Sequence, residues 1–403
     1  MSADISNKTV IENIDTNNNE AKNNKENAFD MSNIKLERGD TPQDIKDRCY
    51  QLCRNYLADV WLTVGIDDIE VKRLSGGLTN QLYYCAINDI HRTNDASAPQ
   101  EVAIRLYQTK HFNENERTSD MIIGLMVSQC GLGPKLYGVF PDGQIQKYYK
   151  HKSFRKEQQT DPKLVEELAE KLARIHAMDV PISKTTHWMF NYFENYYRDG
   201  NETFDMPALI NETNSETLQK FDLRLELDWL KNTIVKFDSP VTFTHVDFRG
   251  SNIMVTEDDS IVLCDFEYSC YDYRGYDFGT IFIEWGQKFW GDKDDDKPYE
   301  FTDDSQIVPF LETYILESTK LLGDKFANDP RNNVKRMIRE VKLFSMVSMM
   351  FIVLFMYRMK ESIFNTIEFN KKQQMAMTEK TYKAYQDLKS QFMIQNAFNT
   401  DLD

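Results

Sequence analysis

The sequence predicts an α+β protein with two lobes: a small N-terminal lobe with an antiparallel sheet and a larger, mostly helical C-terminal lobe. Alternating apolar and polar residues between about positions 69 and 145 indicate strands. After Tyr149 the apolar spacing becomes helical, interrupted by a hairpin at 252–265. A chain of 403 residues with 41% hydrophobic content can bury a sizeable core. We therefore expect an N-terminal lobe at 41–149 and a C-terminal lobe at 150–395.

The chain begins with a segment, 1–40, that is rich in Asn, Lys and Glu and poor in aromatic residues. This composition predicts a disordered tail. Ordered structure is expected from Thr41 and Pro42, which suit the cap and the first turn of a helix. The helix would carry one apolar stripe, formed by Ile45, Cys49, Leu52 and Tyr56.

Strands of the small lobe are predicted at 68–74, 81–86 and 102–107, followed by a helix at about 118–130. Two further strands are expected on either side of the turn Pro141-Asp142-Gly143.

In the larger lobe, Asp161 and Pro162 open a helix whose apolar stripe is Leu164, Leu168, Leu172 and Ile175. The apolar run 343–357 is shorter than the roughly 20 residues that a membrane span needs, and it contains serines. It is expected to be a buried helix and not a membrane span.

Composition excludes some classes of function. A net charge of -16 argues against non-specific binding of nucleic acid, which draws on a basic surface. The six cysteines form no pair of CxxC motifs, so a structural zinc site is not expected. The N-terminus shows no apolar secretory segment. We expect reduced thiols and a cytoplasmic location.

The first chemical constellation lies at the ends of the hairpin. Its two strands, 253–255 and 261–264, bring Asn252 and Asp265 together, with Asp247 just upstream. Phosphoryl transfer to an alcohol needs a carboxylate near the hydroxyl and oxygen ligands for a cation such as Mg²⁺. Asp247 suits the first task and Asn252 with Asp265 the second. The alternative is a hairpin with incidental polar ends.

The second constellation is Ser75-Gly76-Gly77-Leu78-Thr79-Asn80, which lies between two strands. Glycines allow close approach of the backbone, and exposed N–H and hydroxyl groups could hold phosphate oxygens. The alternative is an ordinary hairpin turn. Arg105, on an otherwise apolar strand, is a candidate to contact nucleotide phosphates, with Asp120 as its ion-pair partner. Its alternative is a surface arginine.

Further candidates lie around Asp247. Arg249 would stabilise charge on the transferring phosphate, with a plain salt bridge as an equal alternative. His245 is expected to be a structural hydrogen-bonding residue. Asp277 is a candidate to accept backbone hydrogens of the catalytic loop, and Glu284 to face the substrate. The alternative for either is an ordinary ion-pair acid.

Five segments together resemble the choline/ethanolamine kinase family. They are SGGLTNQLYYC, EVAIRLY, LGPKLYGVFPDGQIQKYY, HVDFRGSN and the distinctive VLCDFEYSCYDYRGYDFGTIFIEW. The resemblance, over about residues 41–390, implies a protein-kinase-like fold with ATP and Mg²⁺ as cofactors. It implies that Asp247 is the catalytic base and that Asn252 and Asp265 ligate Mg²⁺. The N-terminal lobe, 41–149, would bind the nucleotide through the glycine loop, Arg105 and a hinge at Gln146, Lys147 and Tyr148. The C-terminal lobe, 150–395, would be the catalytic and substrate-binding lobe.

The same resemblance places Glu284 in the acceptor pocket, where it balances an ammonium charge. Aromatic rings usually complete this pocket by cation–π attraction. Here Leu354 and Tyr357 align with family tryptophans, and Phe289, Ile367 and Phe369 are further wall candidates. The altered wall is expected to hold the cation more weakly and to affect substrate choice.

We expect ATP-dependent phosphorylation of choline to phosphocholine, the first step of phosphatidylcholine synthesis, by a homodimer. One alternative acceptor is ethanolamine or another small amino alcohol. An alternative of a different class is a weakly active regulatory dimer partner. Val246 and Asp120 stand where the family commonly has Asn and Glu, but the catalytic set is present. A protein kinase is disfavoured because Asp265-Phe266-Glu267 replaces Asp-Phe-Gly and no Ala-Pro-Glu segment follows.

Overall fold

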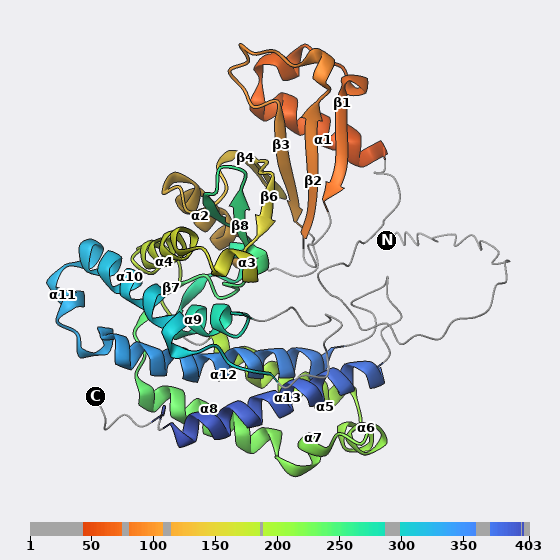
Figure 1. Ribbon diagram of the computed structural model, residues 1–403. Coiled ribbons are helices and arrows are strands. Elements are labelled where there is room, and N and C mark those ends of the chain that lie inside the picture. The colour runs from red at the N-terminus through yellow and green to blue at the C-terminus, as the bar shows by residue number, and fades with distance from the viewer. Residues whose placement is uncertain are drawn as a thin grey trace, which may run out of the picture.

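The computed structural model describes residues 43–74, 80–107, 114–185, 188–286, 299–359, 371–395 and 397–398. A β-rich lobe stands at one end of a larger helical lobe (Figure 1). Several predictions lie outside the described residues: the tail 1–40, the helix start at Thr41 and Pro42, the loop residues Ser75, Gly76, Gly77, Leu78 and Thr79, and the wall residues Phe289, Ile367 and Phe369.

The small lobe has a five-stranded antiparallel sheet in the order β1-β2-β3-β5-β4. Its strands are β1 (Ile69–Leu74), β2 (Asn80–Ile87), β3 (Glu101–Tyr107), β4 (Leu136–Phe140) and β5 (Gly143–Lys147). Its helices are α1 (Gln43–Leu57) and α2 (Glu114–Gln129), with short 3-10 turns η2 (Asp59–Leu62), η3 (Ile66–Asp68) and η4 (Asp89–His91). The predicted strands and helices of this lobe are confirmed.

The alternation of side chains along β3 decides which way Arg105 points. Val102, Ile104 and Leu106 are buried in the core that the sheet shares with α1. Successive side chains of a strand face opposite sides, so Arg105 lies on the other face of the sheet. That face meets the larger lobe.

The apolar stripe of α1 differs in part from the prediction. Cys49, Tyr50, Cys53 and Leu57 are the buried residues, whereas Tyr56 is 41% exposed. Cys49, Cys53 and Leu57 follow each other at intervals of four, which lines them up along one face of the helix. The predicted position of Tyr56 on the buried stripe is therefore wrong.

The larger lobe is mostly helical. Its helices are α3 (Lys156–Gln159), α4 (Pro162–His176), α5 (Trp188–Thr203), α6 (Met206–Glu212), α7 (Glu216–Lys220), α8 (Leu223–Phe237), α9 (Gly275–Phe282), α10 (Asp304–Leu322), α11 (Asp324–Ala327), α12 (Val334–Arg358) and α13 (Lys371–Ile394), with η5 (Gly250–Asn252), η6 (Phe266–Tyr268) and η7 (Pro330–Asn332). Its strands are β6 (His151–Ser153), β7 (Val241–Thr244), β8 (Ile253–Thr256), β9 (Ile261–Leu263) and β10 (Cys270–Tyr273). They form two small sheets, β6-β8-β9 and β10-β7.

The helix predicted to open at Asp161 is α4. The Asp161 side chain accepts a hydrogen bond from the backbone N–H of Lys163, and Pro162 fills the first turn. All members of the predicted stripe are buried. The boundary of the two lobes at residues 149 and 150 stays a prediction.

α12 is the central helix of the larger lobe (Figure 1). Its length and hydropathy would allow it to cross a membrane, but 83% of its most apolar window is buried within the protein. The predicted core helix is confirmed. α9 lies directly on α12, since a Cβ at Gly279 would come within 2.2 Å of the Phe344 carbonyl. Only glycine permits this approach of the two backbones. Asp277 also belongs to α9, so this packing fixes its position.

Strands β8 and β9 form the predicted hairpin. Ile253, Val255, Ile261 and Leu263 are buried in the core of the larger lobe. The backbone N–H of Cys264 donates to the carbonyl of Asn252 at 2.9 Å. The two outer ends of the hairpin therefore meet, as predicted.

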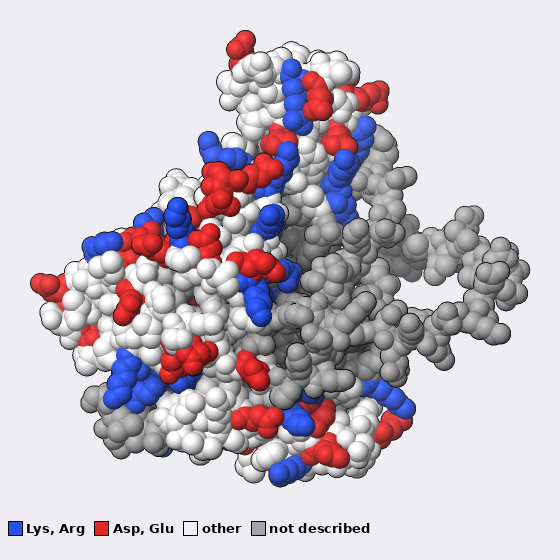
Figure 2. All heavy atoms as spheres, in the orientation of Figure 1, with Lys and Arg blue, Asp and Glu red and all other residues white. Residues whose placement is uncertain are grey.

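Charged side chains of both signs are interspersed over the described part of the surface in Figure 2, without a continuous basic patch on this face. The homodimer and the absence of a nucleic-acid partner stay predictions.

Candidate active site

Asp247 lies in the loop between β7 and β8, which we call the catalytic loop (residues 245–252). The Asn252 side-chain amide donates to Asp247 Oδ2 at 2.7 Å and to its backbone carbonyl at 2.9 Å. The Asp247 side chain is 25% exposed. Its carboxylate is thus held in one orientation while an incoming hydroxyl can still reach it.

Val246 has a left-handed backbone conformation, with φ 71°, although it is β-branched and buried. This conformation is unfavourable for a β-branched residue and needs support from its surroundings. Asp277 gives that support, because its carboxylate accepts the backbone N–H of His245 at 2.8 Å and of Val246 at 2.7 Å. The predicted contact of Asp277 with the catalytic loop is confirmed.

The side chain of Asp277 is fully buried and contacts His176 of α4. His176 Nε2 lies 3.1 Å from Asp277 Oδ2, and His176 Nδ1 lies 2.9 Å from the Tyr314 hydroxyl. A neutral histidine that donates from Nε2 accepts the tyrosine proton at Nδ1. This chain of hydrogen bonds joins the core to the catalytic loop.

His245 has a structural role, as predicted. Its ring is fully buried, and Nε2 donates to the backbone carbonyl of Cys264 at 2.9 Å. The Ser269 hydroxyl donates to the His245 carbonyl at 3.2 Å. These contacts tie the catalytic loop to the segment that carries Asp265.

Asp265 has a left-handed backbone, with φ 64° and ψ 57°. Burial raises the pKa of its carboxyl, and the Arg105 guanidinium, at 3.4 Å, opposes this increase. The side-chain nitrogen of Asn252 donates to Asp247. The side-chain oxygen of Asn252 therefore remains available to a cation. The oxygen atoms of Asn252 and Asp265 are the type that Mg²⁺ prefers.

Arg105 joins the small lobe to the larger one. Its guanidinium lies 2.8 Å from Glu267 Oε2 and 3.4 Å from Asp265 Oδ1. Burial disfavours its charge, but Asp120, Asp265 and Glu267 together raise the pKa of Arg105. The main partner is therefore Glu267, which the sequence analysis missed.

The predicted partner Asp120 is 3.7 Å from the guanidinium. Asp120 accepts a closer hydrogen bond, at 2.7 Å, from the Tyr107 hydroxyl and another from Gln144 at 3.1 Å. Glu267 was visible in the sequence as the departure from Asp-Phe-Gly. The structure gives a reason for this departure, because the carboxylate of Glu267 pairs with Arg105 of β3.

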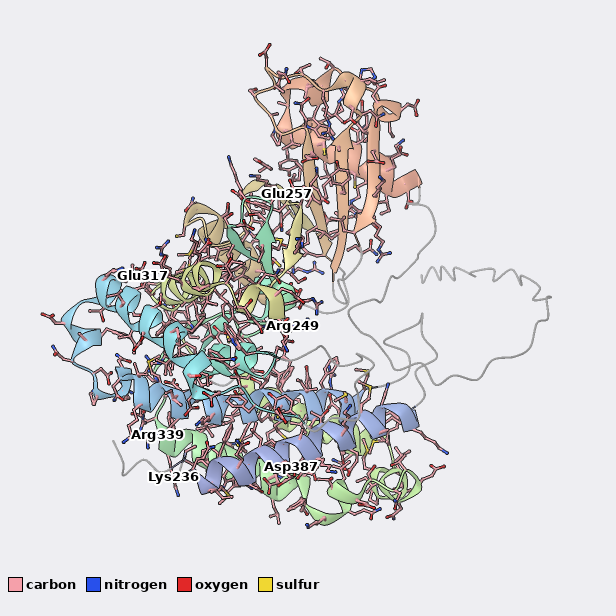
Figure 3. All side chains as sticks on the ribbon, viewed as in Figure 1. Lys236, Arg249, Glu257, Glu317, Arg339 and Asp387 are labelled. Atoms are coloured by element: carbon pink, nitrogen blue, oxygen red, sulfur yellow. The ribbon has the colours of Figure 1, made fainter. Side chains whose placement is uncertain are left out.

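Arg249 and Glu284 flank Asp247. Arg249 Nε lies 3.0 Å from Asp247 Oδ1. Figure 3 shows Arg249 between the five-stranded sheet of the small lobe and α12. Glu284 Oε2 accepts the backbone N–H of Gly250 at 3.0 Å. Burial raises the pKa of Glu284, and the positive charge of Arg249 lowers it in part. Gly250 is required here, because a Cβ would lie 2.1 Å from the Phe154 carbonyl.

The predicted hinge lies at the end of β5. Gln146 donates to the Gln144 side chain at 3.3 Å, Lys147 lies over the Tyr149 ring at 4.9 Å, and Tyr148 meets Tyr84 edge-on at 4.6 Å. Within the described residues no contact joins these side chains to Asp247. Asn80 begins β2. Nucleotide binding by the hinge and by Asn80 stays a prediction.

Tyr357 packs against α5. Its ring stacks on Tyr197 with centroids 6.1 Å apart, and its hydroxyl donates to Asn201 at 3.0 Å. Leu354 is fully buried. The role of Tyr357 as an acceptor-wall residue stays a prediction.

Tyr268 was also missed by the sequence analysis. It lies three residues after Asp265, in η6, and burial raises the pKa of its hydroxyl, as do the charges of Glu267 and Asp247. The charges of two carboxylates of the site thus act on the Tyr268 hydroxyl. Its position directly after the Asp-Phe-Glu triplet was the available signal.

Comparison with known sequences gives a consistent result. The sequence model of the choline/ethanolamine kinase family matches residues 71–384. A choline/ethanolamine kinase of Homo sapiens is 30% identical over 336 residues, covering 81% of this chain and 82% of that protein. A probable ethanolamine kinase of Arabidopsis thaliana is 28% identical, covering 59% of this chain and 62% of that protein.

Solved structures show the same fold. A choline kinase of Cryptosporidium parvum has a TM-score of 0.65 at 18% identity, covering 87% of this chain and 97% of that one. An ethanolamine kinase of Plasmodium vivax has a TM-score of 0.61 at 20% identity, covering 87% and 90%. The predicted bilobal, protein-kinase-like fold is confirmed.

Proposed function

Because this chain belongs to the choline/ethanolamine kinase family, we propose that it transfers the γ-phosphoryl group of ATP to the hydroxyl of choline or ethanolamine. The observation that supports this proposal most directly is the orientation of Asp247. Asn252 and Arg249 hold its carboxylate from two sides, and Asp277 holds the backbone beneath it.

In the reaction, the hydroxyl oxygen of the acceptor forms a bond to the γ-phosphorus while the bond to the leaving ADP oxygen breaks. Asp247 accepts the hydroxyl proton as that bond forms. Arg249, beside Asp247, places positive charge where the transferring phosphoryl group passes. Glu284 offers a partly desolvated carboxylate to the ammonium group of the acceptor.

Asn252 and Asp265 fit a Mg²⁺ ion that is shared with the nucleotide. Mg²⁺ is usually held by one or two carboxylates together with substrate phosphates. Within the described residues no group of three or more His, Cys, Asp or Glu side chains is placed to hold a metal ion. When bound, the ion would neutralise negative charge on the phosphates. The resemblance in sequence and this pair of oxygen donors support the assignment.

The experiment that tests the proposed function is ADP release by the full chain with Mg²⁺ and ATP. Choline, ethanolamine, their mono- and dimethylated intermediates and a blank without acceptor are compared. Stimulation by choline or ethanolamine of at least about tenfold over the blank is expected, since chemistry requires an acceptor hydroxyl. A folded protein that binds ATP but responds to none of these acceptors would contradict the proposal.

Replacement of Glu267 by Gln is expected to raise KM for ATP by about three- to tenfold, with a smaller effect on kcat. The guanidinium of Arg105, now 2.8 Å from a carboxylate oxygen, would donate to a neutral amide oxygen instead, so it is held less firmly toward the nucleotide. Initial rates at varied ATP measure this change. Asp120→Asn is the matched control, because its carboxylate is 3.7 Å from the same guanidinium. An equal effect of the two variants would contradict the assignment of Glu267 as the main partner.

Replacement of Glu284 by Gln is expected to leave the thermal stability equal or higher while it weakens binding of the acceptor. The folded state raises the pKa of Glu284 above its ordinary value of 4.5. Its charged form therefore destabilises the fold at neutral pH, and this cost disappears as the pH falls below 4.5. The glutamine variant should have an equal or higher Tm at pH 7.5, with the difference from wild type shrinking toward pH 4.5.

The same Glu284→Gln variant should raise KM for the amino alcohol while KM for ATP is unchanged. The Gly250 N–H still finds an oxygen acceptor in the glutamine, so the catalytic loop is preserved. Thermal melts at the two pH values and initial rates check both statements. A lower Tm at pH 7.5 would show that the Glu284 charge stabilises the fold, against this expectation.

A further inference from the structure

Gln374, on the buried face of α13, differs from the other polar side chains around it. Thr378 donates from its hydroxyl to the backbone carbonyl of Gln374 at 2.8 Å, and Lys371 donates to the carbonyl of Tyr357 at 2.8 Å. The Gln374 side chain is fully buried, yet among the described residues neither its oxygen nor its nitrogen has a hydrogen-bond partner. A buried amide in this state is unfavourable, so we expect its partner to come from outside the chain, as a ligand or a water molecule.

Contacts near both ends fix how α13 lies along α12. Lys371 contacts the Tyr357 carbonyl near one end, and Lys342 Nζ donates at 3.0 Å to the glutamine directly after α13 near the other. The two helices are therefore antiparallel neighbours (Figure 1). Both rise about 1.5 Å per residue, so three residues after Lys371 on α13 correspond to three residues before Tyr357 on α12. Gln374 is thus at the level of Leu354, which is also fully buried.

The direction of helical side chains brings the Gln374 amide closer still to the end of α12. A long side chain in a helix points back toward the N-terminus, over the preceding turn. Gln374 follows Lys371 by three residues and therefore shares its face of α13. The amide of Gln374 is accordingly directed toward Leu354 and Tyr357, the two positions of α12 that the sequence analysis assigns to the acceptor wall.

Glu284 approaches the same part of α12 from α9. The backbone approach at Gly279 is followed, four residues further along α12, by a contact of 3.1 Å between Thr280 Oγ1 and Ser348 Oγ. The contacts of α9 thus advance toward the C-terminal end of α12. Glu284, four residues after Thr280, is therefore directed toward the turn that carries Leu354.

One continuous cluster of buried side chains joins these segments. It contains Val246 of the catalytic loop, Ile283 beside Glu284, Leu354 and Tyr357 of α12, and Met375 next to Gln374. The unpaired amide, the carboxylate of Glu284 and the catalytic loop therefore border one region of the larger lobe.

We propose that Gln374 is a specificity-determining residue of the acceptor site: its amide oxygen accepts an N–H of a primary ammonium group, which favours ethanolamine over choline. This inference rests on the proposed function and adds to it a residue that contacts the acceptor. Gln374 binds the ammonium end of the acceptor and does not touch the reacting atoms.

The two acceptors differ in what they offer a buried amide. The ammonium of ethanolamine has three N–H donors and can pair with Glu284 and Gln374 together. A trimethylammonium group has no N–H, so its methyl groups would lie against the amide and leave it unpaired. A site built around such a polar group discriminates against an analogue that lacks the matching donor. Leu354 offers the larger cation no ring face in compensation.

The test uses ethanolamine, its mono- and dimethylated forms and choline, which we call the acceptor series. In wild type, kcat/KM should decrease along the series, with a large step at the loss of the last N–H. Gln374→Met keeps the length of the side chain and removes its polar atoms. This variant should raise KM for ethanolamine at least about tenfold, the range of one hydrogen bond to a charged group, while KM for choline stays equal or falls and KM for ATP is unchanged.

Gln386→Met is the matched control. Gln386 is also a buried glutamine of α13, and its Nε2 likewise has no partner among the described residues. It lies about 18 Å further along the helix, away from Leu354. The acceptor series should keep its wild-type order in this variant. A change equal to that of Gln374→Met would overturn the assignment of Gln374.

Thermal melts of the full chain without ATP test Gln374 separately from the reaction. Gln374→Met should have an equal or higher Tm than wild type, because no hydrogen bond within the protein is lost. Ethanolamine should raise the Tm of wild type more than that of the variant. Equal shifts, or an unchanged KM for ethanolamine, would overturn the proposal.

Gln374→Leu serves as a second apolar variant. If both apolar variants fail to fold or lose Tm clearly, the amide has a structural partner such as a bound water molecule, and the proposal is overturned. If wild type phosphorylates no amino alcohol, the proposed function fails, yet the Tm shift caused by ethanolamine still decides the role of Gln374.

Discussion

Replacement of Asp247 by Asn is expected to lower kcat by about a thousandfold while ATP still binds. A general base contributes about 10²- to 10⁴-fold, and an amide cannot accept the hydroxyl proton. The change also brings an amide group against the Asn252 amide, which now donates to the Asp247 carboxylate at 2.7 Å. Activity at saturating ATP and acceptor, measured as ADP release, gives the effect.

The control for Asp247→Asn is that ATP affinity and Tm stay close to wild type. Asp247 is partly exposed, so its replacement removes little packing. A variant that keeps more than about a tenth of wild-type kcat would contradict the assignment of Asp247 as the base, given the size of the effect expected. The same variant tests the alternative of a regulatory partner, because a partner that acts by association alone would keep its effect.

Replacement of Asp277 by Asn is expected to cost both stability and turnover. Asp277 is fully buried and accepts two backbone N–H groups of the catalytic loop as well as the contact from His176. An asparagine has one acceptor oxygen, and its NH₂ group would face a donor. Breaking a buried charged network costs about 3–5 kcal/mol. Val246 would then lose the contact that supports its left-handed backbone.

Urea unfolding and kcat measure the two effects of Asp277→Asn, and kcat should fall by at least about tenfold because the catalytic loop loses its anchor. Asp272→Asn is the matched control. Asp272 is also buried and accepts backbone N–H groups, from Met189 at 3.3 Å and Tyr273 at 2.8 Å, but none from the catalytic loop. This control should lose stability and keep kcat. Equal losses of kcat in both variants would show that Asp277 acts through general stability.

The sequence alone determined much of the local structure and one group of catalytic candidates. Period-two alternation predicted the strands around Arg105, and the Asp161-Pro162 start with its apolar stripe predicted α4. The spacing of Asp247, Asn252 and Asp265 around a hairpin predicted that the three would converge. These features depend on neighbours within a few residues or across one short turn, where backbone geometry leaves few alternatives.

Other features depended on contacts between distant segments, and only the tertiary structure decided them. Arg105 forms the predicted ion pair with Asp120 at 3.7 Å, but the packing of the two lobes adds a closer partner, Glu267, at 2.8 Å. Arg358 lies on the ring of Tyr196, which belongs to another helix. Sequence spacing limits which side chains share a face of one element. It does not determine how two elements rotate against each other, and that rotation is set by the packing of the whole core.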